Sequence, residues 1–192
     1  MKKIYLLMVA LLLPTCALSQ QFALKTNVLS DAFLNINIGG EIMLAPKWSL
    51  EAEGQFNGWT LSHQRRWKHW AIQPEVRYWL CDAYSGHFFG AHVHGGQYNM
   101  GGFDGWYHLF GTDAGKLSES RYQGWFAGLG VSYGYAWILN RHWNLEAEIG
   151  LGYSYTKYDK FACKGCGKKT ETDKVHHYAG PTRLAFNIVY IF

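Results

Sequence analysis

Two short stretches carry pairs of glutamates at a spacing that could support acid–base chemistry. WSLEAE occupies residues 48–53 and WNLEAE occupies residues 143–148. Residues two apart share a face of a β-strand, so each copy would present two carboxylates on one face and Trp, Leu and Ala on the other. Paired carboxylates can exchange protons, bind a cation or form buried ion pairs. The elements that carry them decide between these roles.

Apolar and polar residues alternate with period two through most of the chain, which is typical of strands. One face of each run is apolar with aromatics toward its ends, and the other is rich in Gly, Ser, Asn and charged residues. A continuous apolar face opposite a small and polar one predicts an all-β fold, an eight-stranded antiparallel transmembrane β-barrel of the outer-membrane type. The runs lie at residues 21–29, 35–45, 48–58, 67–80, 87–99, 121–138, 143–157 and 180–192.

The links between these runs favour the same fold. PK, CDAYSG and LNRH are short, whereas GWTLSHQRR, residues 100–120 and residues 158–179 are long. Short and long links alternate in outer-membrane barrels. The chain ends in RLAFNIVYIF, an amphipathic strand whose last residue is Phe192, so we expect the barrel assembly machinery as a partner. Because Pro74 cannot donate a ladder hydrogen bond, we expect a bulge in the fourth strand.

The N-terminus predicts export. Two lysines precede an apolar run and a small-residue end, so we expect a signal peptide at residues 1–19 and one barrel domain at residues 20–192. No later apolar stretch reaches the ~20 residues of a membrane helix. We therefore expect an outer-membrane location, with membrane lipid and lipopolysaccharide as neighbours. The formal net charge of +4 is modest and no basic run occurs, so we expect no nucleic-acid partner.

The polar faces would fill the barrel interior, which eight strands make just wide enough for side chains. Buried charges must be paired, so we predict an ion network, with a metal or proton site as the alternative. Six carboxylates face three fixed cations, so some histidines or carboxylates should hold extra protons. The predicted network comprises Lys25, Glu41, Glu51, Glu53, Glu75, Arg77, His92, His94, Glu146, Glu148 and Arg183. The predicted aromatic girdle comprises Trp48, Trp137, Trp143 and Phe192.

The last long link contains a C-x-x-C motif. Cys163 and Cys166 precede His176 and His177 by about ten residues. In an oxidising environment such a motif favours a small disulfide loop, while a zinc site or redox activity remain alternatives. The link is also basic, which suits lipopolysaccharide, an acidic partner or simple solvation. Its lysines are Lys160, Lys164, Lys168, Lys169 and Lys174.

Catalysis is a weaker hypothesis. Histidines and serines could form a lipid-modifying site, but no G-x-S-x-G motif occurs. We therefore expect no catalytic residue, cofactor or resident metal. A narrow pore is a third alternative, disfavoured by the filled interior. The residues that catalysis could use are His87, His92, His94, Ser62, Ser118 and Ser154.

Several strings along the chain resemble those of a known family, namely FALKTNVL, WKHWAIQPEVRYW, GHFFGAHVHGGQYN, YGYAWILNRHWNLEAEIGLGYSY, CKGCG and YAGPTRL. This is a Bacteroidetes outer-membrane family known as domain of unknown function 3575. The resemblance implies an outer-membrane barrel and supplies no activity, substrate or catalytic residue. Some members are thought to lie beside fimbrial genes. We therefore expect a non-enzymatic envelope or surface protein that presents loops to a partner, with adhesin or fimbrial assembly as a context.

Overall fold

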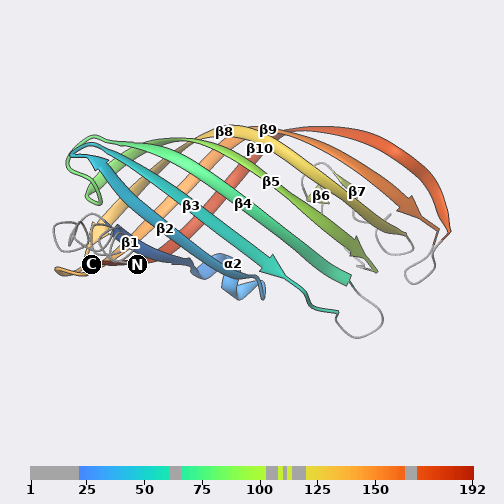
Figure 1. Ribbon diagram of the computed structural model, residues 1–192, viewed down its shortest axis with the longest axis horizontal. Helices are drawn as coiled ribbons and strands as arrows, with labels where there is room; N and C mark the ends of the chain where they lie inside the picture. The colour runs from blue at the N-terminus through green and yellow to red at the C-terminus, as the bar shows by residue number, and fades with distance from the viewer. Residues whose placement is uncertain (1–21, 61–65, 103–107, 110–111, 114–119, 163–167) are drawn as a thin grey trace, which may run out of the picture.

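Eight antiparallel strands form one closed ring in the computed structural model (Figure 1). The predicted all-β class and strand number are therefore confirmed. The structure describes residues 22–60, 66–102, 108–109, 112–113, 120–162 and 168–192. In chain order, the ring strands are β1 (Phe22–Asn27), β2 (Ile36–Ala45), β3 (Trp48–Asn57), β4 (Arg66–Trp79), β5 (Gly86–Gly101), β8 (Arg121–Ile138), β9 (Trp143–Phe161) and β10 (Lys169–Ile191). The other elements are α2 (Val28–Ala32) and a separate pair, β6 (His108–Leu109) and β7 (Thr112–Asp113).

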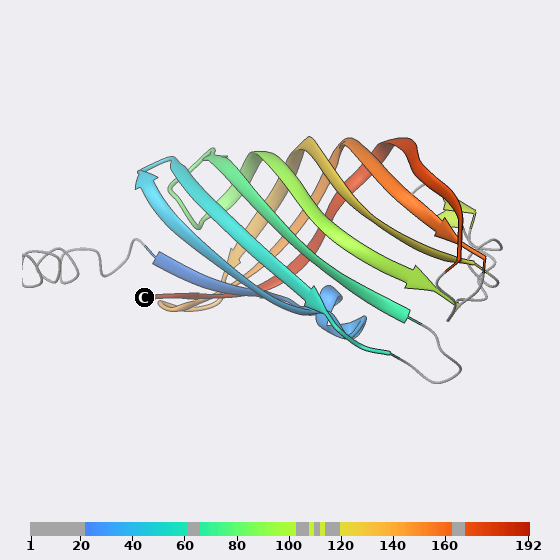
Figure 2. The same cartoon turned by 45° about the vertical axis from the view of Figure 1, so that its right-hand side comes forward.

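The strands are staggered around the ring. Ala23 of β1 pairs with Ile191 of β10. In the other direction Ala23 pairs with β2, and the row of directly paired residues then continues through β3, β4, β5, β8 and β9. This row returns to β10 at Gly180 rather than at Ile191. A sheet of tilted strands closes with this kind of offset. Because Ala23 pairs with Ile191, both described ends of the chain lie together, at the end of the ring that carries the short turns (Figure 2).

Two predicted boundaries were wrong. The expected link at residues 158–179 is largely strand, because β9 continues to Phe161 and β10 begins at Lys169. The expected first strand ends at Asn27, where α2 begins. The long hairpin was missed because its charged residues do not alternate with apolar ones. Beyond the apolar part of the ring both faces are polar, so period two carries no signal there.

The predicted bulge at Pro74 was also wrong. Pairing between β4 and β5 stops at Ile72 and resumes at Glu75 in the same register, so only the ladder is interrupted. A register shift occurs instead in β10, between Pro181 and Arg183. Thr182 is the additional residue there, which is the arrangement of a β-bulge.

A side chain extends the seam between β1 and β10. The two strands share only five residue pairs. Asn27 belongs to the last pair, and its side chain bonds to the β10 backbone beyond that pair. Its Oδ1 accepts a hydrogen bond of 3.2 Å from the Phe186 N–H, and its Nδ2 donates one of 3.3 Å to the Leu184 carbonyl. The same Oδ1 accepts from the Leu29 N–H and caps α2, which lies against β10.

The helical content of the described residues is limited to this short element. None of their helices is long and apolar enough to cross a membrane.

The outer face of the ring carries an apolar belt that is exposed. Its aliphatic part comprises Ile38, Leu50, Ile72, Val76, Val93, Leu129, Val131, Ile149, Leu151, Leu184 and Ile188. Aromatic residues bound it toward the short turns, namely Trp48, Tyr78, Trp137, Trp143 and Phe192, and toward the other end, namely Phe56, Trp70 and Trp125. Buried positions, in contrast, are mostly polar or charged. The ring is therefore apolar outside and polar inside.

The interior is closed at the end with the short turns. Trp79, Phe88 and Val189 are buried there together with small alanines. Tyr84, from the turn after β4, packs against this cluster, and its side chain is 6% exposed. The Trp79 indole donates to Ser49 Oγ at 2.8 Å, which links this apolar plug to the polar layer above it.

Candidate functional site

The polar interior begins with a row of like charges. Glu41, Glu51 and Glu75 are direct neighbours on β2, β3 and β4, and His92 of β5 continues the row. Like charges directly opposite each other destabilise a sheet. This row can be buried only if cations lie between the carboxylates.

Arg77 supplies the central cation. Its side chain is fully buried and its Cζ lies 4.4 Å from the centroid of the Phe88 ring, which seats the guanidinium on the apolar plug. The guanidinium contacts carboxylates from β2, β3, β4 and β9. The distances are 3.0 Å from Nη1 to Glu41 Oε2, 2.6 Å from Nη1 to Glu51 Oε2, 2.7 Å from Nε to Glu75 Oε1, 3.0 Å from Nη1 to Glu146 Oε1 and 2.5 Å from Nη2 to Glu148 Oε2.

Lys25 and Arg183 complete the network from the two strands of the seam. Lys25 Nζ lies 2.8 Å from Glu51 Oε2 and 2.9 Å from Glu146 Oε2, and it also pairs with Glu41. Arg183 Nε lies 2.8 Å from Glu148 Oε2, and its Nη2 pairs with Glu51. The two WxLEAE stretches therefore converge on shared cations from opposite walls of the ring.

The network is buried and unevenly charged. Its six carboxylates are all buried, and its fixed cations are Lys25, Arg77 and Arg183. Glu148 Oε1 and Arg183 Nη1 have no hydrogen-bond partner among the residues that the structure describes. Within the described part of the chain, no group of three or more His, Cys, Asp or Glu side chains could hold a metal ion. Such an arrangement suits a structural plug in which some carboxylates or histidines keep a proton, since a buried ion without a partner is costly.

Two histidines lie above the network and reach across glycines. His92 Nε2 lies 3.0 Å from Thr182 Oγ1, and His94 Nε2 lies 2.5 Å from Ser154 Oγ. On β8, the residues opposite them are Gly130 and Gly128, so no side chain blocks the path. His92 Nδ1 lies 3.3 Å from Glu75 Oε2 and joins the network, whereas His94 makes no described ion pair.

The other predicted site residues are dispersed. Cys163 and Cys166 lie outside the described residues. His176 and His177 are consecutive in β10 rather than in a link, so their side chains point to opposite faces. His177 pairs with the Tyr153 hydroxyl on the outer face. The predicted girdle residues Trp48, Trp137, Trp143 and Phe192 are all exposed on the outer face.

Several polar partners of the network were absent from the sequence-based set. Ser49 donates to Glu41, Ser132 Oγ donates to Glu75 Oε2 at 3.1 Å, and Asn187 Nδ2 donates to Glu146 Oε1 at 3.0 Å. Period-two alternation already placed these three on the inner face. Thr182 could not be found this way, because the bulge changes the alternation at that point.

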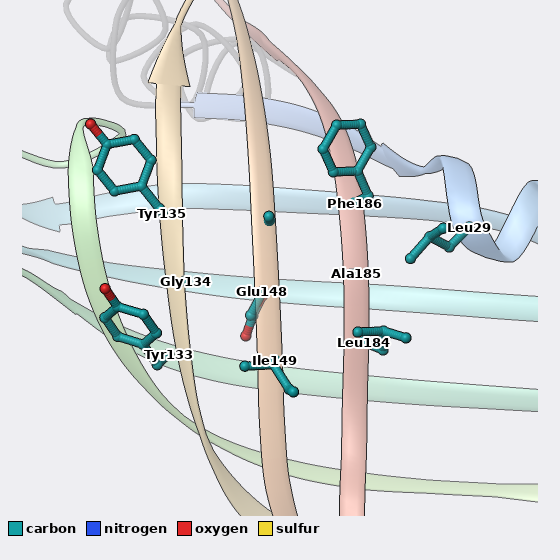
Figure 3. A pocket seen from close by; sticks show the side chains of 10 residues that line it. Leu29, Tyr133, Gly134, Tyr135, Glu148, Ile149, Leu184, Ala185 and Phe186 are labelled. Atoms are coloured by element: carbon teal, nitrogen blue, oxygen red, sulfur yellow. The ribbon is translucent and has the colours of Figure 1, made fainter.

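A shallow depression marks the outer wall on the reverse side of Glu148 (Figure 3). Ala147 forms its floor and is paired with Tyr135 on β8 and Phe186 on β10, whose larger side chains flank it. Leu29 of α2 contributes to the lining near the seam. Since the lining side chains are almost entirely apolar, the depression belongs to the apolar belt.

The structure is thus a closed antiparallel ring whose apolar residues lie on the outer face and whose charged residues fill the interior, the reverse of the distribution in a soluble protein. The chain belongs to the family described as "Protein of unknown function (DUF3575)", whose model matches residues 4–192. No curated protein matches the chain.

Proposed function

We propose that the protein is an outer-membrane β-barrel that is exported by its N-terminal signal peptide and presents its outer end to a partner at the cell surface. The inverted ring is the observation that carries this proposal. A soluble protein rarely exposes a continuous apolar surface, whereas a membrane-spanning barrel requires one. The exposed belt and its two aromatic borders supply such a surface.

The interior supports a structural rather than a conducting role. The plug around Trp79 and Phe88 closes one end, and the ion network fills the lumen above it. A narrow pore is disfavoured because the described side chains of the plug are buried and uncharged. The barrel acts as a rigid support for the structures beyond its outer aromatic border.

The β9–β10 hairpin is the most extended of these structures. Two ion pairs hold its charged part, Lys157 Nζ to Asp173 Oδ1 at 2.9 Å and Lys169 Nζ to Asp159 Oδ2 at 2.6 Å. The hydrogen bond from Lys169 lowers the pKa of Asp159 from its ordinary value. An ordered hairpin suits recognition of a protein partner, with adhesin or fimbrial assembly as the context that we favour.

Localisation and topology test this proposal together. An epitope placed in the link between β9 and β10 should be accessible on intact cells, and one in the turn at residues 139–142 should become accessible only after permeabilisation. The protein should fractionate with the outer membrane and migrate faster on gels when unheated. Recovery in the soluble fraction, or equal accessibility of both epitopes, would overturn the proposal. Single-channel recordings should show no conductance.

A lipid-modifying enzyme is the second candidate, favoured only by the contact between His94 and Ser154. A serine nucleophile needs such a base, but it also needs a group that orients the base. His94 Nδ1 has no hydrogen-bond partner among the described residues, so this group is lacking. Mass spectrometry of lipid A from cells with wild-type protein or Ser154→Ala decides the matter, because any mass change that depends on Ser154 establishes catalysis.

A further inference from the structure

Two arginines flank one glycine on the outer face of the ring. Gly101 of β5 is paired with Arg66 of β4 on one side and with Arg121 of β8 on the other. Both arginines share the outward face with an aromatic of the belt four residues away, Trp70 and Trp125 respectively. In tilted strands, four residues correspond to a rise of roughly 10 Å. The arginines therefore lie just beyond the outer aromatic border.

Arg121 is held in place by its neighbours. Its Cζ lies 4.0 Å from the centroid of the Phe161 ring, and Phe161 is buried beneath it. A guanidinium that stacks on an aromatic face keeps the donors at its edge available. Burial, and after it the charge of Arg66, lowers the pKa of Arg121 from its ordinary value. The two cations stand on the two strands that flank β5, beside the same residue of that strand.

Two described acidic residues of the β9–β10 hairpin are already engaged. Asp159 pairs with Lys169 and Asp173 pairs with Lys157. Among the described side chains, no carboxylate pairs with Arg66 or Arg121, and Arg121 Nε has no hydrogen-bond partner. Two like charges that flank one strand position, with no ion-paired carboxylate among the described residues, favour the binding of an anion from outside the chain.

We propose that Arg66 and Arg121 bind the phosphate group of an anionic lipid of the outer leaflet. The assignment to a lipid rests on the proposed function, because it uses the height of the pair above the apolar belt. Guanidinium groups recognise phosphate through paired donors. Gly101 places no side chain between them, and a Cβ there would lie 3.0 Å from Arg121 Cα and 3.1 Å from Arg121 Cβ, so a larger residue would displace Arg121.

Native mass spectrometry of the refolded protein in a non-ionic detergent tests the site. The probes are diphosphoryl lipid A, the same lipid after removal of its phosphates, and inorganic phosphate. The test variant is Arg66→Gln/Arg121→Gln. The matched control is Lys47→Gln/Arg141→Gln, which removes the same charge from the opposite end. Unheated gel mobility shows that every variant is folded, so this assay is independent of cellular location.

We expect diphosphoryl lipid A to bind the wild-type protein and the control alike, and to bind the test variant at least about fivefold more weakly. The dephosphorylated lipid should bind both proteins equally weakly. Equal binding of lipid A to the wild-type protein and the test variant would overturn the site, as would an equal loss in the control. Competition by inorganic phosphate at the concentration of the lipid would overturn the assignment to a lipid.

Discussion

Thr182 and Arg183 are consecutive residues of β10 whose side chains both face the interior. The bulge between Pro181 and Arg183 makes this possible, since alternation would otherwise send one of them outward. Thr182 reaches His92 and Arg183 reaches Glu51 and Glu148. The bulge therefore allows β10 to contribute one side chain to the contact with His92 and the next side chain to the ion network.

The role of Thr182 can be separated from that of the bulge. Thr182→Val removes the hydroxyl beside His92 and should lower the free energy of unfolding by about 1 kcal/mol. Deletion of Thr182 restores regular alternation with Arg183 still inward, so it should cost a similar amount. Urea unfolding in detergent measures both. A deletion variant that fails to fold while Thr182→Val folds would show that the bulge itself is required.

Arg77→Met should be the most damaging single substitution in the network. It leaves several buried carboxylates without their shared cation, and breaking a buried pair in this way costs about 3–5 kcal/mol. The midpoint of thermal unfolding in detergent should fall sharply. Arg77→Met/Glu148→Gln should recover part of the loss, because one of the stranded charges is removed.

The control for this series is Arg141→Met. Arg141 is exposed in the turn that precedes β9, so its substitution should change stability by less than about 0.5 kcal/mol. If Arg77→Met unfolds at the same temperature as this control, the ion network does not stabilise the barrel.

Gly130→Ala should destabilise the ring because its methyl group has no space. A Cβ there would lie 2.6 Å from both His92 Nε2 and Leu151 O, and the second atom belongs to the backbone. Overpacking of this kind costs about 1–3 kcal/mol. Gly54→Ala is the matched control, since the nearest atom to its Cβ would be Ile38 O at 3.9 Å. Chemical unfolding should leave the control within about 1 kcal/mol of the wild type.

Asn27→Ala should loosen the seam between β1 and β10. The substitution removes the cap of α2 and two hydrogen bonds to β10, so we expect a loss of about 1–2 kcal/mol. Hydrogen exchange at the Phe186 amide should accelerate, while exchange in the middle of β8 should not. Asn27→Asp retains the acceptor and should be intermediate. Unchanged exchange at Phe186 in Asn27→Ala would show that the side chain does not hold the seam.

Alternation in the sequence was sufficient for the class of fold because each strand separates two environments. Trp143, Leu145 and Ala147 face outward while Glu146 and Glu148 face inward, and this period needs no knowledge of neighbouring strands. Alternation is lost where the two environments stop differing, so it did not predict the charged part of the β9–β10 hairpin. The bulge expected at Pro74 rested on one local rule, the missing N–H of proline, and was wrong.

The sequence by itself determined which residues of the regular strands face the interior, because the inward side of such a strand is a local property with period two. Only the tertiary structure decided which of those residues meet. Register and stagger bring Glu51 of β3 and Glu146 of β9 to the same lysine. The bulge in β10 directs Arg183 into the interior, where it pairs with Glu51 of β3 and Glu148 of β9. The paired glutamates of WSLEAE and WNLEAE are joined through cations from other strands, and contacts between strands so distant in sequence depend on the closure of the whole ring.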